Sequence, residues 1–179
     1  MFLERFMQAV EVTSLVIVSP WIQSLDGEPI SLKDILWSVE KGKVPTTIIM
    51  RSPEKEHLNR EAAELFEGCP FVTLYYNNEL HAKVYVCRCQ PFGFALLGSA
   101  NLSGQATRAL EVGLLIEGKG AGCAIIEELE LLGKEDIPNR AGTQLRQLAR
   151  APDFRTYFKK HLFRGGFLSY RGHYNFLIM

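Results

Sequence analysis

Short apolar runs alternate with amphipathic segments along the first 76 residues, and this alternation limits the possible folds more than any other feature. Runs at 14–19, 46–50 and 71–76 are rich in β-branched and aromatic residues, which predicts buried strands. Between them, residues 31–43 and 52–68 place apolar side chains at helical spacing. Strands that alternate with helices and later follow one another directly predict an α/β fold, with a mixed β-sheet flanked by helices.

Capping residues mark the expected helix starts. Ser31 and Ser52 stand where helix N-caps are expected, and Pro53 would occupy the first helical position after Ser52. The apolar stripe of the second of these helices is Leu58, Ala62, Leu65 and Phe66. The remaining expected elements are a short helix at 1–12, strands at 81–86, 92–98 and 110–118, and a closing helix at 122–133.

The composition indicates an ordered chain with a basic end. Of 179 residues, 47% are hydrophobic, and no repeat or linker interrupts residues 1–150, which we expect to form a single domain. The net charge is zero, but residues 151–179 hold five lysines and arginines against one aspartate, a net +4 that leaves −4 for the rest. This segment also contains eight phenylalanines and tyrosines. We expect it to pack on the same domain, with contact to nucleic acid or to a partner protein as the alternatives.

The four cysteines do not have the spacing of a zinc or redox motif. Cys87 and Cys89 form C-x-C without a nearby histidine pair, and Cys69 and Cys123 stand alone, so buried or incidental thiols are expected. No metal ion or other cofactor is predicted. The chain has no signal peptide pattern and no membrane-spanning run, which favours the cytoplasm.

The segment HAKVYV, at 81–86, combines strand propensity with two titratable side chains. Alternation along a strand would put His81, Lys83 and Tyr85 on one face and the valines on the other. By itself this pair says little, because H-x-K is common by chance and a lone histidine in a strand is usually structural.

A second polar cluster ends the next expected strand. The sequence GSANLSG brings backbone N–H groups, the Ser99 hydroxyl and the Asn101 amide to a strand terminus, where they suit a tetrahedral anion. A carboxylate, Glu111, follows in RALEVGLLIEG. Two polar clusters on neighbouring strands, with a carboxylate after them, predict a functional site.

Together, HAKVYV, GSANLSG and LEVGLLI resemble the H-x-K and G-S-x-N signature of the phospholipase D superfamily, over about residues 70–117. The resemblance implies a phospholipase D-like fold and phosphodiesterase (hydrolase) activity. The full motif of that superfamily continues to an aspartate, and this position holds Arg88. Arg88 could itself pair with a carboxylate in place of the missing aspartate.

The resemblance implies a role for each residue. His81 would attack phosphorus and form a phosphohistidine, while Lys83 and Asn101 would hold the phosphoryl oxygens. Ser99 would help to fix that geometry, and Glu111 would accept a hydrogen bond from the other nitrogen of His81. This scheme requires no metal ion.

One histidine cannot easily be both the attached nucleophile and the proton donor in the same step. The chain contains no second copy of the motif, so the resemblance implies a symmetric homodimer in which two His81 side chains face each other. Trp21, in SPWI, could contact a base or sugar, or anchor the core. Arg51 closes the second strand and could reach phosphate, or remain an ordinary surface arginine.

The function most favoured by the resemblance is a metal-independent nuclease that cleaves DNA or RNA. One alternative is a noncatalytic dimeric nucleic-acid-binding or scaffold module of a larger DNA-processing or defence complex, with a partner protein. A second alternative is a lipid phosphodiesterase, although the chain offers no basic amphipathic helix for a membrane surface.

Overall fold

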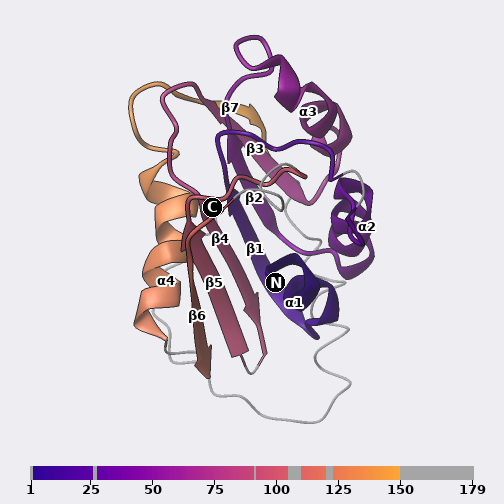
Figure 1. The fold of residues 1–179 in the computed structure, drawn as a ribbon, viewed down its shortest axis with the longest axis vertical. Helices are drawn as coiled ribbons and strands as arrows, with labels where there is room; N and C mark the ends of the chain where they lie inside the picture. Colours follow the sequence, from indigo (N-terminus) through magenta and orange to yellow (C-terminus); the bar gives the residue numbers. More distant parts are fainter. Residues whose placement is uncertain (1, 26–27, 91, 105–109, 120–122, 150–179) are drawn as a thin grey trace, which may run out of the picture.

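The computed structural model describes residues 2–25, 28–90, 92–104, 110–119 and 123–149, whose strands form a seven-stranded mixed sheet (Figure 1). The order of the strands is β6-β5-β4-β1-β2-β3-β7, with β1, β2 and β3 parallel and every other neighbouring pair antiparallel. The predicted mixed α/β sheet is therefore confirmed. The strands are β1 (Val12–Val18), β2 (Thr46–Met50), β3 (Val72–Asn77), β4 (Val84–Cys89), β5 (Phe92–Gly98), β6 (Gly113–Lys119) and β7 (Thr143–Gln147).

Helices cover both faces of the sheet (Figure 1). On one face, α1 (Phe2–Gln8), α2 (Leu32–Gly42) and α3 (Arg60–Phe66) pack on side chains such as Leu15 and Ile48. On the other face, α4 (Ala124–Leu131) and the π-helical turn η2 (Leu132–Asp136) bury Ile126 against the second set of strand side chains. None of the helices in the described part of the chain is long and apolar enough to cross a lipid bilayer.

The helix α2 begins as the sequence predicts. The Ser31 hydroxyl accepts the Asp34 N–H at 3.2 Å, and the Asp34 carboxylate accepts the Ser31 N–H at 2.8 Å, which together form a capping box. The hydrogen bonds from Ser31 also hold the pKa of Asp34 below its usual value. Beyond Gly42 the chain leaves the helix at Lys43 in the left-handed conformation.

The predicted helix at 52–68 is wrong in its first half. Ser52 opens a turn, followed by the single 3-10 turn η1 (His57–Asn59), and α3 starts only at Arg60. The reason is the Asn59 side chain, which donates to the Arg51 carbonyl and draws this segment back to the end of β2. Leu58, expected in the apolar stripe, is consequently 49% exposed, whereas Ala62 and Phe66 are buried as predicted.

Other boundaries also differ from the sequence prediction, and the first helix, expected over 1–12, ends at Gln8, since Val12 already belongs to β1. His81 and Lys83 lie before β4, which begins at Val84, and residues 110–112 lie before β6. The predicted alternation nevertheless holds inside β4, since Tyr85 packs in one core and Val84 in the other. The edge strand β7 was not predicted, because TQLRQ has no buried alternating pattern and its pairing with β3 supplies the order. Residues 151–179, expected to pack on the domain, lie outside the described part.

Arg88 occupies the position of the missing motif aspartate and pairs with two carboxylates. It lies near the end of β4, where its guanidinium is 3.2 Å from Glu127 and 3.6 Å from Glu130, both on α4. Burial raises the pKa of Glu130, but hydrogen bonds, first from Lys134, outweigh this and lower it. Arg88 therefore fastens α4 to the sheet, as the sequence analysis considered possible.

Candidate functional site

The topology brings the predicted site residues to one end of the sheet. Because β4 runs antiparallel to β1, Val84 at its start pairs with Val18 at the end of β1. Leu97 pairs with Val84 in turn, and Gly98 at the end of β5 pairs with Gly113 at the start of β6. Since β2 is parallel to β1, its end lies on the same side. The segments that carry Trp21, Arg51, His81, Ser99, Asn101 and Glu111 therefore leave the sheet at a common end (Figure 1).

His81 and Lys83 precede β4 and point toward the ends of β1 and β2. The Lys83 ammonium donates to the His81 carbonyl at 3.0 Å and lies 5.9 Å from the centre of the Trp21 ring. His81 is exposed, and its Nε2 atom lies 3.2 Å from a guanidinium nitrogen of Arg51. These four residues form one contiguous group, which we call the histidine cluster.

Arg51 is the most connected member of the histidine cluster. Besides the contact with His81, its Nε donates to the Leu80 carbonyl at 3.1 Å, and its Nη1 donates to Glu56 at 3.0 Å. The guanidinium carbon lies 4.7 Å from the centre of the Trp21 ring, a cation–π geometry. Hydrogen bonds from Trp21 and then from Arg51 lower the pKa of Glu56, which keeps that carboxylate ionised beside the arginine.

Asn59 supports this cluster from below and was not identified from the sequence. Its side chain is fully buried, accepts the Ile22 N–H at 2.9 Å, and donates to the carbonyls of Pro20 and Arg51 at 2.8 Å each. It therefore ties the segment after β1 to the segment after β2. In the sequence Asn59 falls within a predicted helix, where an asparagine gives no sign of such a role.

Ser99 and Glu111 form a second group, the serine cluster, between β5 and β6. The Ser99 hydroxyl donates to the Glu111 carboxylate and accepts the Val112 N–H at 3.0 Å, while the Ser99 N–H donates to the Val112 carbonyl at 2.9 Å. The preceding Gly98 has no room for a side chain, because a Cβ there would lie 2.4 Å from the Val112 carbonyl oxygen. The glycine thus allows the close approach on which the Ser99 contacts depend.

Hydrogen bonds hold the main chain on both sides of Asn101, whereas the Asn101 side chain keeps an unused hydrogen-bond acceptor. The Tyr85 hydroxyl donates to the Ala100 carbonyl at 2.9 Å, and the Leu102 N–H donates to the Ser19 hydroxyl at 3.2 Å. Burial raises the pKa of Tyr85, so its hydroxyl remains a donor. The Asn101 amide oxygen is buried without a hydrogen-bond partner among the described residues. An unsatisfied buried polar atom costs about 1–3 kcal/mol, and such groups are often found at functional sites.

The structure thus joins six of the predicted residues in two clusters with separate side-chain contacts, and Asn101 belongs to neither cluster. The Glu111 carboxylate contacts Ser99, and the described partner of the His81 ring is Arg51 rather than Glu111. A main-chain hydrogen bond of 3.3 Å, from the Gly98 N–H to the Lys83 carbonyl, links the two clusters. The expected bond between Glu111 and His81 stays a prediction.

A cavity of about 450 Å³ is lined by the turn that follows Arg51, by α3 and by β7. Its lining combines Tyr76 and two arginines with three glutamates, and none of the predicted site residues contributes to it. The cavity has no excess of positive charge, so we do not assign it to the phosphate site.

No metal centre stands out in the described part of the chain. Within it, no group of three or more histidine, cysteine, aspartate or glutamate side chains could hold an ion. The four cysteines are free thiols, and burial is the main cause that raises the pKa of Cys69, Cys87 and Cys89. These thiols are therefore poor nucleophiles and poor metal ligands.

Comparisons with known proteins find similarity in structure. No family model matches the sequence, and no curated protein matches it. The crystal structure of Nuc from Salmonella typhimurium, a phospholipase D family member, superposes with a TM-score of 0.59 at 12% identity, over 82% of this chain and 90% of Nuc. TrmBL2, an archaeal chromatin protein described with a novel mode of DNA binding, gives a TM-score of 0.46 at 10% identity, over 76% of this chain and 47% of that one. The match to Nuc, together with the mixed sheet and its flanking helices, shows that this chain has a phospholipase D-like fold.

Proposed function

We propose that this chain is a metal-independent phosphodiesterase that cleaves nucleic acid through a phosphohistidine, at a site shared by two subunits. The observation that carries the proposal is the gathering of His81, Lys83, Ser99, Asn101 and Glu111 at one end of a phospholipase D-like sheet. These residues come from separate segments, and they supply an imidazole, a cation and amide and hydroxyl groups within one region.

The first step transfers the phosphoryl group to the protein. Nε2 of His81 attacks phosphorus, the N–P bond forms, and the bond from phosphorus to the leaving oxygen breaks. Lys83 and the Asn101 amide group stabilise the charge on the nonbridging oxygens. The leaving oxygen takes a proton from the partner subunit's His81, which acts as the general acid.

The second step returns the histidine to its starting state. The partner subunit's His81, now neutral, takes a proton from a water molecule that attacks phosphorus on the opposite face. The N–P bond breaks and the new P–O bond leaves a phosphomonoester. Ser99 holds Glu111 just before β6, where we expect the carboxylate to orient an imidazole.

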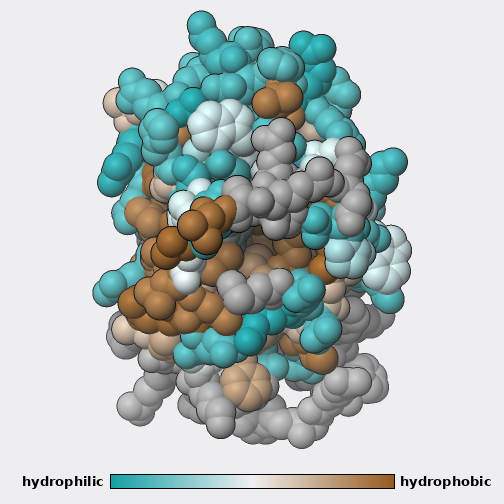
Figure 2. Space-filling model, viewed as in Figure 1, coloured by the Kyte–Doolittle hydropathy of each residue, from teal (hydrophilic) through white to brown (hydrophobic). Residues whose placement is uncertain are grey.

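A homodimer is favoured by an apolar surface next to Glu111. Leu110, Val112 and Leu114 flank Glu111 and Gly113 and are 100%, 77% and 62% exposed. Figure 2 shows hydrophobic surface gathered over the region of β5 and β6. Exposed apolar side chains in a row are typical of a surface that meets another protein. Because each chain has one histidine in an H-x-K motif and the proposed reaction needs two imidazoles, we assign this surface to a second copy.

Nucleic acid is the proposed substrate because the histidine cluster combines cations with an aromatic ring. Arg51 and Lys83 both lie against Trp21, so a phosphate held by the cations would have a base or sugar near the indole. The basic, aromatic segment 151–179 adds the same chemistry in sequence and is proposed as a further contact. We also propose that the protein is cytoplasmic.

The test is cleavage of single- and double-stranded DNA and of RNA in excess EDTA. We expect cleavage by the wild-type chain and its loss in His81→Ala. His57→Ala is the matched control, because His57 is also exposed but lies in η1, outside both clusters. Binding without cleavage by the wild-type chain would instead support the noncatalytic module.

A further inference from the structure

Arg51 contacts the nitrogen of His81 that the proposed reaction uses. The guanidinium nitrogen Nη2 and the imidazole nitrogen Nε2 are 3.2 Å apart. A guanidinium carries only donors, so Nε2 must accept this hydrogen bond, and in a neutral ring the proton then lies on Nδ1. The geometry therefore selects one of the two tautomers of the imidazole.

The position of Arg51 is set by contacts that are independent of His81. Its Nε and Nη1 bind the Leu80 carbonyl and Glu56, and its own carbonyl accepts from the buried Asn59. Its side chain is only 15% exposed. A side chain held by two hydrogen bonds, on a main chain fixed by Asn59, keeps Nη2 in place whether or not the imidazole moves, so the arginine positions the histidine rather than the reverse.

We propose that Arg51 is a positioning residue that keeps Nε2 of His81 unprotonated in the free protein and then binds the phosphate itself. The first half depends only on the contact described here. The second half rests on the proposed function: a phosphorus atom approached by Nε2 brings a nonbridging oxygen within reach of the same Nη2 donor. One N–H group thus serves the imidazole before binding and the substrate afterwards. Once it has moved to the phosphate, the partner subunit's His81 is free to carry on Nε2 the proton that it gives to the leaving oxygen.

This assignment gives Arg51 the role that the sequence analysis gave to Glu111. A carboxylate would select the tautomer by accepting from Nδ1–H, whereas the arginine selects it by donating to Nε2. Both contacts favour the same tautomer, with the proton on Nδ1. The described part of the chain contains the arginine contact, so a single subunit already holds the tautomer required for attack.

The tautomer is measured directly by nitrogen-15 NMR of the full chain with labelled histidine, at alkaline pH and without substrate. His81 is assigned by the signal that disappears in His81→Ala. We expect the wild-type ring mainly as the Nδ1–H form, and Arg51→Met to change the majority species to the Nε2–H form that imidazoles favour in water. A wild-type ring that is mainly Nε2–H, or an unchanged ring in Arg51→Met, overturns the proposal.

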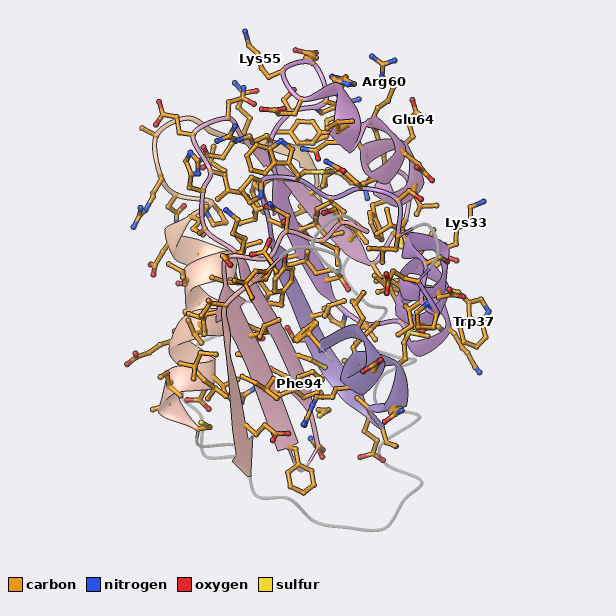
Figure 3. All side chains as sticks on the ribbon, in the orientation of Figure 1. Lys33, Trp37, Lys55, Arg60, Glu64 and Phe94 are labelled. Atoms are coloured by element: carbon orange, nitrogen blue, oxygen red, sulfur yellow. The ribbon has the colours of Figure 1, made fainter. Side chains whose placement is uncertain are left out.

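Arg60→Met is the matched control for this measurement. Arg60 is exposed at the start of α3 and projects outward from the molecule (Figure 3). We expect its substitution to leave the His81 tautomer unchanged, and a change equal to that of Arg51→Met would overturn the assignment. Once His81 has been assigned with a folded His81→Ala variant, the wild-type spectrum alone is informative, so the test does not depend on how well the arginine variants fold.

Cleavage kinetics test the second half. Arg51→Met should lower kcat about 100-fold, the scale of losing one preorganised donor to the transition state, and Arg51→Lys should recover part of it. Equal kcat in wild type and Arg51→Met would overturn the transfer to phosphate. If no chain cleaves nucleic acid while the tautomer shift is seen, the proposed function fails and the positioning role stands.

Discussion

The two ends of β4 use arginine in different ways. At the end of the strand, Arg88 faces two carboxylates, Glu127 and Glu130, so its charge is fully matched. Beside the start of the strand, Arg51 pairs with Glu56 and gives another donor to the His81 ring, while the Lys83 ammonium donates to the His81 carbonyl. At the end of β4 the arginine therefore uses its charge to hold a helix, whereas at the start of β4 the ammonium of Lys83 has no carboxylate partner among the described residues, which suits the proposed phosphate.

Among the substitutions at the two ends of β4, loss of Lys83 should have the largest effect, which is on catalysis. We expect Lys83→Met to reduce kcat/KM about 1,000-fold, because a cation that stabilises the phosphoryl oxygens would be removed at the end where charge is not matched. Initial rates on a short labelled DNA give the ratio. Lys55→Met, at an exposed turn lysine (Figure 3), should change it little, and similar losses in both variants would remove the distinction.

An aspartate at position 88, as in the full motif, should lower the stability of the protein near the end of β4. Arg88→Asp would place a third carboxylate beside Glu127 and the half-buried Glu130, so we expect about 3 kcal/mol less stability to unfolding. Urea denaturation measures the loss. Arg88→Met should lose less, about 1–2 kcal/mol, because it removes the pairing without adding repulsion. A more stable or more active Arg88→Asp would mean that position 88 serves the site.

Truncation of Asn59 should lower the stability of the protein and loosen the histidine cluster, because Asn59 links the segments that carry Trp21 and Arg51. We expect Asn59→Ala to lose about 2 kcal/mol of stability, since the Ile22 N–H and the Arg51 carbonyl would lose the Asn59 side chain as partner, and the Pro20 carbonyl would keep only the Arg51 N–H. The His81 tautomer should also become mixed as Arg51 shifts. A variant that loses stability but keeps the wild-type tautomer would show that Asn59 holds the fold alone and not the histidine cluster.

A charge in the apolar surface should weaken the dimer. Val112→Glu should raise the dimer dissociation constant about tenfold, by placing an unpaired charge in the contact. Light scattering over a dilution series measures it. Leu145→Glu is the matched control, because Leu145 is 54% exposed on β7 at the opposite edge of the sheet. Equal weakening by both variants would place the contact elsewhere.

The smallest expected effect concerns acid stability. The pKa of Glu56 is lowered below its usual value near 4.5, so the stabilisation it gives is present above that value and is lost as the pH falls. Glu56→Gln should therefore show a slightly flatter loss of stability between about pH 5 and 3 than the wild type. Parallel curves for the two proteins would show that the Arg51 contact does not contribute to stability.

The sequence was most informative where local rules decide the structure. Apolar runs located β1, β2, β3 and β5, and the Ser31 capping box located the start of α2. The predicted helix start at residue 52 was wrong, because the Asn59 side chain binds the carbonyls of Pro20 and Arg51, which follow β1 and β2. The strand β7 was not predicted because a contact distant in sequence, its pairing with β3, orders the segment TQLRQ.

The candidate site could be predicted by residue type more readily than by contact. His81, Lys83, Ser99, Asn101 and Glu111 were identifiable from their motifs, and the sheet brings their segments to one end. The contact between Arg51 and the His81 imidazole could not be predicted from the sequence. Arg51 lies 30 residues from His81, and its orientation depends on Glu56 and Leu80. Such contacts depend on side-chain packing that no spacing rule contains.

Position 98 has a consequence for engineering this chain. The missing side chain there gives a steric clearance that no polar group can replace, so a single methyl would act as a wedge between the two outer strands. Sequence libraries aimed at new substrates could vary the polar residues freely and still fail at this one backbone contact. The tolerance of the site to change is therefore limited by the room available to its main chain before it is limited by its chemistry.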